Sequence, residues 1–566
     1  MNRNTESHFS LLPHADISRS RFDRSASVKT TFNVGDIVPF FLDEVLPGDT
    51  FDVKTSKVVR LQTLITPPMD NLYLDTYYFF VPNRLVWDHW KEFCGENTES
   101  AWIPATEYSI PQLTSPASSG WSVGSLADYF GIPTGIPGLS VSALPFRAYA
   151  LIMNEWFRDQ NLQDPLVVPL DDSTVTGVNT GTFVTDVAKG GKPYIASKYH
   201  DYFTSCLPAP QKGPDVLIPV AQAANLPVKA LPTAYTPSVT PTVVYSGSQS
   251  SPYGGMSDIN LSQQALYYGH GASVGGVSTF DAAVAAPPSS PVSFVNLYAV
   301  QDGNAQAATI NQLRLAFQIQ KFYEQQARGG SRYTEVVRSF FGVTSPDARL
   351  QRPEYLGGNR VPITINQVVS QAGVVNDGKI AYPLGDVAGQ SLTTDTHSDF
   401  LKSFTEHGFV IGVMVARYDH TYQQGLNRMW SRKDKFDFYW PVFSNIGEQA
   451  VKNKEIYAQG TNSGSKDDEV FGYQEAWAEY RYKPNTVTGE MRSSYATPLD
   501  SWHFADNYKV LPTLSDSWIR EDKANVDRAL AVQSSVSNQL FCDVYVQNYA
   551  TRPMPMYSIP GLIDHH

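Results

Sequence analysis

The chain contains little cysteine: Cys94, Cys206 and Cys542 are the three among 566 residues. Their odd number and wide spacing exclude a disulfide framework, and they also exclude the paired CxxC pattern of a metal or redox site. We therefore expect all three to be small buried apolar residues in a protein of the reducing cytoplasm.

Long apolar runs are also missing. No stretch approaches the ~18 uninterrupted apolar residues that a membrane-spanning helix needs. The N-terminus, MNRNTESHFSLLPHADISRSRF, lacks the apolar core of a signal peptide. These absences predict a chain that is made and used as a soluble protein, with no membrane insertion.

Charge is sparse as well, and it has the wrong sign for a free nucleic-acid binder. Charged residues make up 17% of the chain, below the usual quarter, and the net charge is -12. Proteins that bind nucleic acid through their overall field are strongly basic, so that class is excluded, although local basic patches remain possible. Low charge fits a protein whose surface is mostly covered by partners.

The residues that are abundant favour β structure. Aromatic residues make up 12% of the chain, and 38 prolines accompany 39 glycines, which is typical of short strands joined by long loops. Apolar residues alternate from Val28 to Val34 and again from Phe51 to Thr55, with Pro47-Gly48-Asp49 as the turn between these two strands.

Three further strands are predicted. Residues 70–82, DNLYLDTYYFFVP, are apolar on both faces, which indicates a strand covered on two sides. Residues 408–418 and 541–549 also have strand character. Strands so far apart in sequence suit an antiparallel jelly roll, in which long loops leave two facing sheets undisturbed.

Two helical regions interrupt this pattern. Residues 143–160 place Phe146, Ala150, Met153 and Phe157 on one stripe, with Pro145 in the first turn. Residues 307–330 align Ile310, Leu313 and Phe317 and end at two glycines, after which Ser331 is expected to cap a short helix through Phe341.

The segment 207–293 has an unusual composition. It holds five charged residues, 12 prolines and 8 glycines. Disordered segments usually carry more charge, so we expect an extended, loop-rich insertion that buries its surface against copies of itself or another protein, and not a separate globular domain.

Several stretches carry a family resemblance. They are PHADISRSRFDRSASVKTTFNVGDIVPFFLDEVLPGDTF, DNLYLDTYYFFVPNRLVWDHWKEFCGE, RAYALIMNEWFRDQNL, RGGSRYTEVVRSFFGVTSPDARLQRPEYLGG and TRPMPMYSIPGLIDH. Together they resemble the major capsid protein of the Microviridae, specifically its gokushovirus branch. The resemblance covers nearly the whole chain except residues 207–293, where this family varies most.

The resemblance implies a structural protein without a cofactor. It implies a mainly β fold, a single eight-stranded antiparallel jelly roll with long loop and helical insertions. Sixty copies would form a T=1 icosahedral shell around circular single-stranded DNA. The implied partners are an internal scaffolding protein, a small basic DNA-binding protein and a DNA pilot protein, and assembly would take place in the cytoplasm of the bacterial host.

This reading divides the chain into five segments: an extended arm at 1–27, jelly-roll parts at 28–206 and 294–550, the insertion at 207–293 and an extended tail at 551–566. In gokushoviruses a large insertion forms protrusions at the three-fold axes, proposed to contact a receptor on the host surface. The candidates for attachment here are Tyr253, Tyr267, Tyr268 and His270.

Two segments combine basic and aromatic residues. The arm carries Arg19, Arg21 and Arg24 around Phe22, which suits contact with single-stranded DNA or bridging between subunits. Residues 427–441 carry a second group, which suits DNA or acidic groups on a neighbouring subunit. Its members are Arg428, Trp430, Arg432, Lys433, Lys435 and Phe436.

Three short motifs carry little weight. Gly120-Trp121-Ser122-Val123-Gly124 matches a nucleophile elbow, but no buried strand precedes it, which favours an ordinary glycine turn. His89, Glu92 and Cys94 lack distant metal-ligand partners, which favours helix packing. Residues 465–469, SKDDE, lack the pattern of a calcium loop, which favours a solvated loop.

Two other classes of function remain open. A lectin or carbohydrate-active enzyme on a β-sandwich would need two carboxylates facing one aromatic cleft. Glu475 and Glu479 are candidates, although their spacing fits one helix face as well. The second class is an adhesin that attaches to host cells outside any shell.

Overall fold

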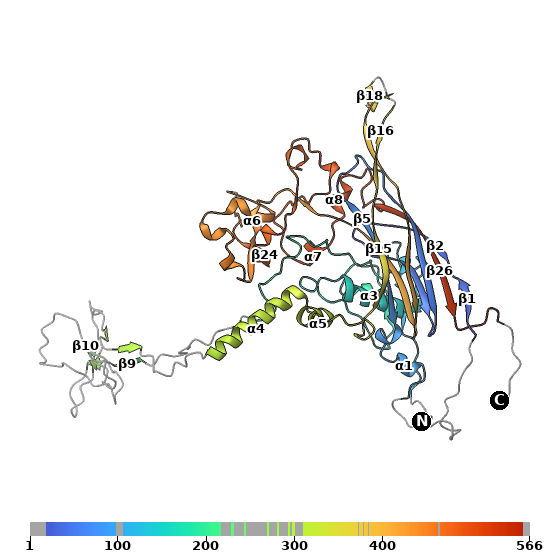
Figure 1. Ribbon diagram of the computed structural model, residues 1–566, viewed down its shortest axis with the longest axis horizontal. Coiled ribbons are helices and arrows are strands. Elements are labelled where there is room, and N and C mark those ends of the chain that lie inside the picture. Colours follow the sequence, from blue (N-terminus) through green and yellow to red (C-terminus); the bar gives the residue numbers. More distant parts are fainter. Residues whose placement is uncertain are drawn as a thin grey trace. The chain divides into compact units, whose positions relative to one another are not determined.

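The structure is a computed structural model, shown in Figure 1. It describes residues 18–97, 106–214, 310–371, 384–461 and 464–558, with short stretches within 216–299 and 373–382. The chain separates into two units. The larger comprises Met1–Lys212 and Glu324–His566, and the smaller comprises Gly213–Tyr323.

The first of two main sheets in the larger unit, here sheet 1, is built around the last strand of the chain. Its strands are β1 (Ser20–Asp23), β2 (Ala26–Phe32), β26 (Leu540–Arg552), β4 (Thr50–Leu61) and β20 (Thr393–Ser403). Strand β26 pairs with β4 on one side and with β1 and β2 on the other, and every pairing is antiparallel. The beginning and end of the described chain thus lie in one sheet.

The second sheet, sheet 2, has four antiparallel strands in the order β15-β5-β21-β3. Their bounds are Val38–Val45 for β3, Leu72–Pro82 for β5, Glu354–Pro362 for β15 and Gly408–Tyr418 for β21. The mainly β fold is therefore confirmed, and the strands predicted at 28–34, 51–55, 70–82, 408–418 and 541–549 all belong to these two sheets.

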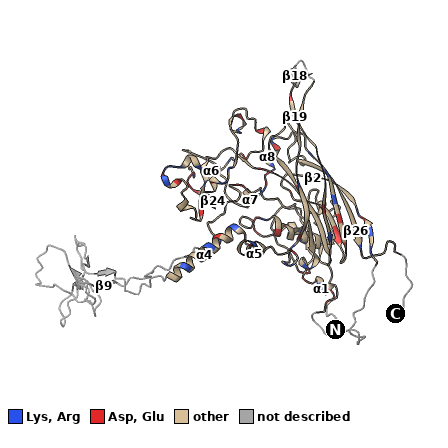
Figure 2. Cartoon of the chain, viewed as in Figure 1, with Lys and Arg blue, Asp and Glu red and all other residues tan. Residues whose placement is uncertain are grey.

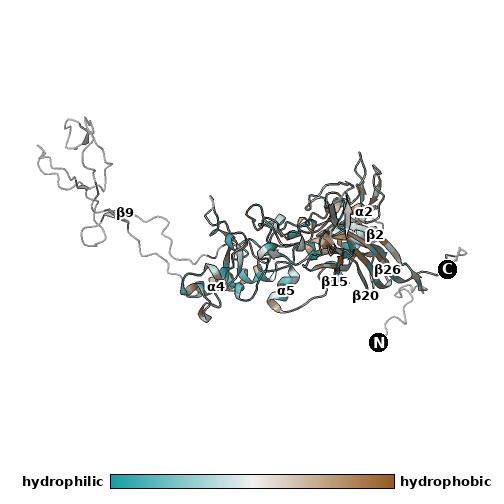
Figure 3. Cartoon of the chain, turned by 90° about the horizontal axis from the view of Figure 1, so that it is seen from above, coloured by the Kyte–Doolittle hydropathy of each residue, from teal (hydrophilic) through white to brown (hydrophobic). Residues whose placement is uncertain are grey.

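The main core lies between the two sheets. Alternate residues of each strand point into it, among them Phe51 and Val544 from sheet 1 and Phe80 and Met414 from sheet 2. The Thr55 hydroxyl of sheet 1 lies 2.6 Å from the Tyr78 hydroxyl of sheet 2. These two buried hydroxyl groups therefore form a hydrogen bond with each other across the core. Figure 3 shows apolar residues concentrated in these strands.

A second core covers the outer face of sheet 2. Helix α3 (Leu144–Ile152) and the π-helical turn Met153–Phe157 bring their apolar stripe against Phe79 and Val413. Trp87 and Trp121 are fully buried in the same cluster. The prediction that residues 70–82 form a strand covered on both sides is confirmed, and so is the helix predicted within 143–160.

The other predicted helices are present, with one difference at a cap. Helix α4 spans Ile310–Gly329 and helix α5 spans Tyr333–Phe341. The N-cap of α5 is Arg332, and the prediction of a cap at Ser331 is wrong. The Ser331 hydroxyl instead donates to Gln160 Oε1 at 2.6 Å, because the chain before α5 packs against residues 159–161.

Sequence reasoning missed strands β3, β15 and β20 of the two main sheets. Because β3 precedes the Pro47-Gly48-Asp49 turn, that turn joins β3 to β4 and not the two strands it was assigned to. Gly48 has φ +90°, which only glycine adopts readily. The adjacent Phe40 and Phe41 break the alternation that would have revealed the strand.

The predicted terminal segments differ from the structure. Ser20–Asp23 of the predicted arm is strand β1, paired with Tyr549–Arg552 of β26, because β26 extends beyond the end of β2 and offers it a free edge. The predicted tail likewise contributes its first two residues to β26. Residues 1–17 and 559–566 lie outside the described residues.

The prediction of three buried cysteines holds for two. Cys206 and Cys542 are buried, and burial raises the pKa of the Cys206 thiol above its usual range. Cys94 is exposed because it follows the end of the short helix α1 (Trp90–Phe93), whose apolar contacts come from Trp90 and Phe93.

A third, smaller core lies farther from the sheets, near α6 and β24 in Figure 1. It includes Tyr202, Tyr422, Val451, Phe471 and Trp518. The elements around it are β22 (Thr421–Tyr422), β23 (Glu448–Lys452), α6 (Asn453–Ile456), β24 (Val470–Glu475), β25 (Asn485–Thr486) and α7 (Asp516–Ile519).

Other short elements complete the larger unit. They are α2 (Leu126–Tyr129), β6 (Gln112–Thr114), β7 (Ser140–Ser142), β8 (Val175–Thr176), β16 (Ile365–Val369), β17 (Val374–Asn376), β18 (Lys379–Tyr382), β19 (Val387–Ser391) and α8 (Ala524–Asp527).

In the smaller unit, three pairs of short antiparallel strands are described. They are β9 (Val228–Ala230) with β14 (Leu297–Ala299), β10 (Val243–Val244) with β13 (Ser293–Phe294), and β11 (Gly269–His270) with β12 (Phe280–Asp281). The predicted insertion 207–293 falls mostly in this unit, but its first six residues, 207–212, belong to the larger unit. Leu207 is buried in the larger unit and bridges to Tyr473.

Candidate assembly and nucleic-acid surfaces

The arginines near the N-terminus lie on sheet 1. Arg21 is exposed, and its guanidinium stacks over the Tyr549 ring at 4.3 Å from the ring centroid. Phe22 is half-buried on β1. Arg19 is exposed, and its guanidinium lies beside the Gly48 turn. These three residues keep polar or aromatic surface toward solvent.

Arg24 has a different role from its neighbours. Its Nε donates to Asp43 Oδ2 at 2.8 Å, and the Asp43 side chain is only 5% exposed. This hydrogen bond raises the pKa of Arg24. It supplies the nearest counter-charge to the buried Asp43 carboxylate, which Arg552 Nη2 also approaches to 3.6 Å. Arg552 Nε lies 3.4 Å from the buried Asp49 Oδ2. The two arginines fasten the first and last strands to the β3–β4 hairpin.

The second predicted basic group lies in residues 427–446, here called the aromatic segment. Three single 3-10 turns give it shape: Arg428–Ser431, Lys435–Asp437 and Pro441–Phe443. The Asn427 side chain accepts from the Met429 N–H at 3.0 Å, and the Asp434 side chain accepts from the Phe436 N–H at 2.7 Å. These caps satisfy donors at the starts of the first two turns.

Two arginines of the aromatic segment point inward. Arg432 Nη2 lies 3.2 Å from Glu479 Oε1, and Arg428 Nη1 lies 3.7 Å from Glu455 Oε1. Both carboxylates are buried, and burial raises the pKa of Glu455 while Arg428 opposes that shift. Sequence analysis left these arginines open to DNA or to acidic groups on a neighbouring subunit. In the structure they pair with carboxylates of their own chain and hold the aromatic segment beside the third core.

The outward face of the aromatic segment is apolar. Trp430 is 71% exposed and Val442 is 87% exposed. The other large apolar residues exposed there are Met429, Phe436, Phe438, Tyr439, Trp440 and Ile446. Lys433 is exposed beside them. Sequence reasoning found the basic residues but did not predict that the aromatic side chains would be left outside.

The two carboxylates considered for a carbohydrate site do not share a helix. Glu475 ends strand β24, and Glu479 lies in the 3-10 turn Ala478–Tyr480, with Trp477 between them at φ 65°. The helix-face interpretation is wrong because the backbone reverses at Trp477. Glu475 pairs with Arg481 and Glu479 with Arg432, so each carboxylate has its own counter-charge.

The weak motifs have structural explanations. Gly120 and Gly124 have φ +66° and +75° and flank the buried Trp121, which fits the glycine turn that was expected. His89 Nδ1 lies 3.0 Å from Asp172 Oδ1. Across the described parts of the chain, no group of three His, Cys, Asp or Glu side chains is placed to hold a metal ion.

The acidic loop 465–469 is organised by lysines. Lys454 Nζ and Lys452 Nζ each lie 2.9 Å from Asp468 Oδ1, and their hydrogen bonds lower the pKa of Asp468 to about 2. Both Asp467 oxygens accept backbone N–H groups, from Gln459 and Gly460. This loop is exposed, as expected.

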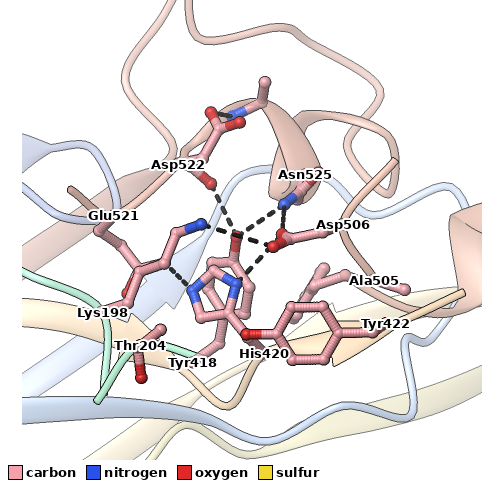
Figure 4. A network of polar contacts seen from close by, with 12 residues as sticks. Lys198, Thr204, Tyr418, His420, Tyr422, Ala505, Asp506, Glu521, Asp522 and Asn525 are labelled. Atoms are coloured by element: carbon pink, nitrogen blue, oxygen red, sulfur yellow. Dashed lines mark hydrogen bonds and ion pairs between the residues drawn. The ribbon is translucent and has the colours of Figure 1, made fainter. Parts of the chain in front are cut away.

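Sequence reasoning missed a buried cluster of polar side chains centred on His420 (Figure 4). His420 Nδ1 lies 3.1 Å from Asp506 Oδ1, and His420 Nε2 lies 2.8 Å from Glu521 Oε1. Lys198 Nζ lies 3.4 Å from Asp506 Oδ2, and Asn525 Nδ2 donates to Asp506 Oδ1 at 2.6 Å.

The electrostatics of this cluster favour a charged histidine. Burial disfavours the imidazolium, but Asp506 and Glu521 outweigh it and raise the pKa of His420 to about 9. Burial would also raise the pKa of Asp506, yet Lys198 and His420 hold it well below its usual range. The cluster links the chain after β21 to residues 506–525. Its ion pairs and hydrogen bonds are buried, which indicates that it stabilises the fold.

Three of the four attachment candidates, Tyr253, Tyr267 and Tyr268, lie outside the described residues. His270 is the second residue of β11. Among the helices that the structure describes, none is both long and apolar enough to cross a membrane.

Comparison with known proteins identifies the family. Residues 10–562 match the model of the capsid protein (F protein) family. The chain is 43% identical to capsid protein VP1 of Spiroplasma virus 4, over 98% of this chain and 97% of the relative. It is 42% identical to capsid protein VP1 of Chlamydia phage 1, over 98% of both chains.

A third relative agrees with these two. Capsid protein VP1 of Bdellovibrio phage phiMH2K is 40% identical over 99% of this chain and 98% of its own length. The resemblance to gokushovirus capsid proteins is thereby confirmed, and the family is a structural one and not a family of enzymes. With nearly its full length matched, the chain belongs to the phage capsid protein (F protein) family.

Proposed function

We propose that this chain is the major capsid protein of a T=1 icosahedral phage shell, built from sixty copies around circular single-stranded DNA. The observation that carries the proposal is the match of residues 10–562 to the capsid family, together with 40 to 43% identity to three VP1 proteins over almost their whole length. A binding module or enzyme that shared only one domain would match over a shorter range.

The strand order supports the finer proposal that the sandwich is an eight-stranded jelly roll. Sheet 1 runs β2-β26-β4-β20 and sheet 2 runs β15-β5-β21-β3, with β1 as an added edge strand. Six of the seven connections between consecutive strands of these eight pass from one sheet to the other, the exception being β5 to β15. Such crossing between facing antiparallel sheets is the pattern of a jelly roll.

The DNA contacts are proposed for a smaller set of residues than sequence indicated. Arg19 and Arg21 keep exposed guanidinium groups, and Phe22 lies between them on β1. Arg24, Arg428 and Arg432 are occupied by buried carboxylates, so a strand of DNA would have to compete with those ion pairs. Lys433 also retains exposed surface, whereas the exposed Trp430 is surrounded by other exposed apolar side chains and is left out of this set.

The other proposed partners are those that the resemblance to gokushovirus capsid proteins implies. The internal scaffolding protein, the small basic DNA-binding protein and the DNA pilot protein would join the shell during assembly in the host cytoplasm. Residues 207–293 would form the three-fold protrusion, with Tyr253, Tyr267, Tyr268 and His270 facing the host receptor. Composition supports this, because a segment so poor in charge needs surface to pack against.

The test is electron microscopy of the full chain co-expressed with the scaffolding protein of its phage. We expect uniform small icosahedra with projections at the three-fold axes. A variant lacking residues 215–285 should still fold and close shells but lose adsorption to host cells. Monomers alone under these conditions would contradict the proposal, and a glycan-binding screen would then test the lectin and adhesin alternatives.

A further inference from the structure

We propose that the outward face of the aromatic segment is a contact between copies of this chain. The face, called the aromatic face, consists of Met429, Trp430, Phe436, Phe438, Tyr439, Trp440, Val442 and Ile446. The proposal deepens the shell function and rests on it, because it assigns one of the surfaces through which neighbouring subunits meet.

The aromatic face is held in a fixed shape. The Trp440 indole Nε1 donates to the Lys435 carbonyl at 2.7 Å, and the Phe436 and Phe443 rings meet edge to face with centroids 6.2 Å apart. Together with the capped 3-10 turns, these contacts order the backbone before any partner arrives. A preorganised surface loses little conformational entropy when it binds.

The segment is held to the rest of the unit by aromatic, ionic and hydrogen-bond contacts. The Arg432 guanidinium lies 4.4 Å from the Tyr480 ring centroid and 5.2 Å from that of Phe438. The Trp477 indole donates to the Phe443 carbonyl at 2.8 Å. The positive charge of Arg432 is thereby drawn to the inner side, where Glu479 neutralises it, and the outer side is left apolar.

The charge of the aromatic face favours protein over DNA. Its exposed charged residues are Lys433 and Lys435 with Asp434 and Asp437, two of each sign. Binding of single-stranded DNA depends on an excess of positive charge along the backbone path, so a balanced surface gains little from phosphates. Exposed aromatic residues and methionine are instead enriched at the centre of protein interfaces.

The size of the aromatic face matches what a subunit contact needs. A large aromatic side chain buries about 150 to 250 Å². Five aromatics and three aliphatic residues, each exposed by between 44 and 87%, therefore offer on the order of 800 Å². A standard interface buries about 800 Å² per partner. Monomers rarely leave an apolar patch larger than roughly 300 to 600 Å² uncovered.

A second copy of the chain is the occupant that these observations favour. In a shell every subunit has several identical neighbours, so a preorganised apolar surface on each copy meets another copy at the same place by symmetry. Trp430 and Trp440 are the expected centres of binding energy, because tryptophan is enriched among the residues that dominate interface affinity.

The first test removes the two tryptophans from the full chain, co-expressed with the scaffolding protein. For Trp430→Ser combined with Trp440→Ser, we expect at least a tenfold drop in the fraction of chain that sediments as shells, with an unchanged circular dichroism spectrum of the unassembled subunit. The matched control is Val510→Ser combined with Val536→Ser, two exposed apolar residues outside the aromatic face, which should assemble normally. Unchanged shell yield in the tryptophan variant would overturn the proposal.

A second test identifies the neighbour directly. In a Cys94→Ser background, Val442→Cys carries a photoactivatable benzophenone on a minority of subunits, and assembled shells are irradiated. We expect a covalent dimer of the chain, absent from Cys94→Ser shells and from unassembled subunits. Adducts to DNA alone, adducts within one chain, or shells without dimers would each overturn the proposal. If unmodified chain forms no shells, the shell function itself fails, and the two failures are thus distinguishable.

Discussion

The two sheets share one core but differ on their outer faces. In sheet 2, β5 and β21 are buried on both sides, with Phe80 and Met414 facing sheet 1 and Phe79 and Val413 facing the second core. In sheet 1, β4 and β26 alternate between buried and exposed residues along most of their length. The outer face of sheet 1 carries charges of both signs near β2 and β26 (Figure 2).

This difference separates what folding needs from what assembly can use. Residues between Val86 and Ala196 cover β5 and β21, so the middle of sheet 2 is internal to each subunit. Sheet 1 leaves Val58, Leu401, Phe541 and Tyr545 exposed and is available to other molecules. Substitutions on the two outer faces should therefore affect different properties: stability for sheet 2, assembly or DNA contact for sheet 1.

The largest effect is expected for Phe79→Ala. Phe79 is 1% exposed on the outer face of sheet 2, and truncating a buried phenylalanine costs about 3 to 5 kcal/mol. The free energy of unfolding of the unassembled subunit, measured by urea titration, should fall by that amount. The matched change on sheet 1 is Tyr545→Ala, for which we expect about 0.5 kcal/mol or less. Equal losses would remove the distinction between the sheets.

The pH dependence of stability should reveal the charged cluster beyond the end of β21. The folded-state pKa of His420, about 9, is above the usual value of about 6.5. Its stabilising contribution is therefore complete below pH 6.5 and is lost as the pH rises through 9, by on the order of 3 kcal/mol. Urea titrations between pH 6 and 9.5 measure this.

The control for that prediction is His420→Gln. Glutamine cannot take a proton, so the variant should be less stable at pH 6 and should lack the decline that the unchanged chain shows above pH 6.5. An equal decline in both proteins would mean that other groups cause it, and that His420 is neutral in the folded chain.

A smaller effect is expected at the edge of sheet 1. Arg24→Ala leaves the buried Asp43 without its main counter-charge, and loss of a hydrogen bond to a charged group costs about 1.5 to 3 kcal/mol. Arg21→Ala removes an exposed contact with Tyr549 worth about 0.5 to 1 kcal/mol. The midpoint temperature of thermal unfolding should be lower for Arg24→Ala than for Arg21→Ala. The reverse order would return Arg24 to the set of free DNA-binding candidates.

The smallest effect is expected for Leu401→Ser. Leu401 is 72% exposed on β20, so the free energy of unfolding should change by no more than about 0.5 kcal/mol. The informative measurement is the fraction of chain in shells. A drop in that fraction at constant stability would show that the outer face of sheet 1 also contacts a neighbour.

The strands and helices that sequence predicted are those with an uninterrupted period. Residues 70–82 and 408–418 were recognisable because both faces are apolar, and α3 because its stripe repeats at helical spacing. Strand β3 was missed because Pro39 and two adjacent phenylalanines obscure the alternation. Strands β15 and β20 were missed because their sequences, EYLGGNRVP and TTDTHSDFLKS, are glycine-containing or mostly polar. Local pattern thus specified most of the sandwich but not its full strand count.

The candidate surfaces were predicted less well, because their partners are distant in sequence. Arg24, Arg428 and Arg432 resembled DNA ligands until Asp43, Glu455 and Glu479 were seen beside them. His420 meets carboxylates 86 and 101 residues away, and no spacing rule connects them. The sequence shows where basic residues occur along the chain. Only the tertiary structure shows whether each one pairs with a carboxylate of the same chain or faces solvent.

Electron cryomicroscopy of assembled shells at side-chain resolution tests the central claim most directly. We predict that Trp430 and Trp440 lie in van der Waals contact with another copy of the chain, while the outer face of sheet 2 is covered entirely by residues of its own copy. Tryptophans that face solvent or DNA in the shell, or a neighbouring subunit packed on Phe79, would contradict this account.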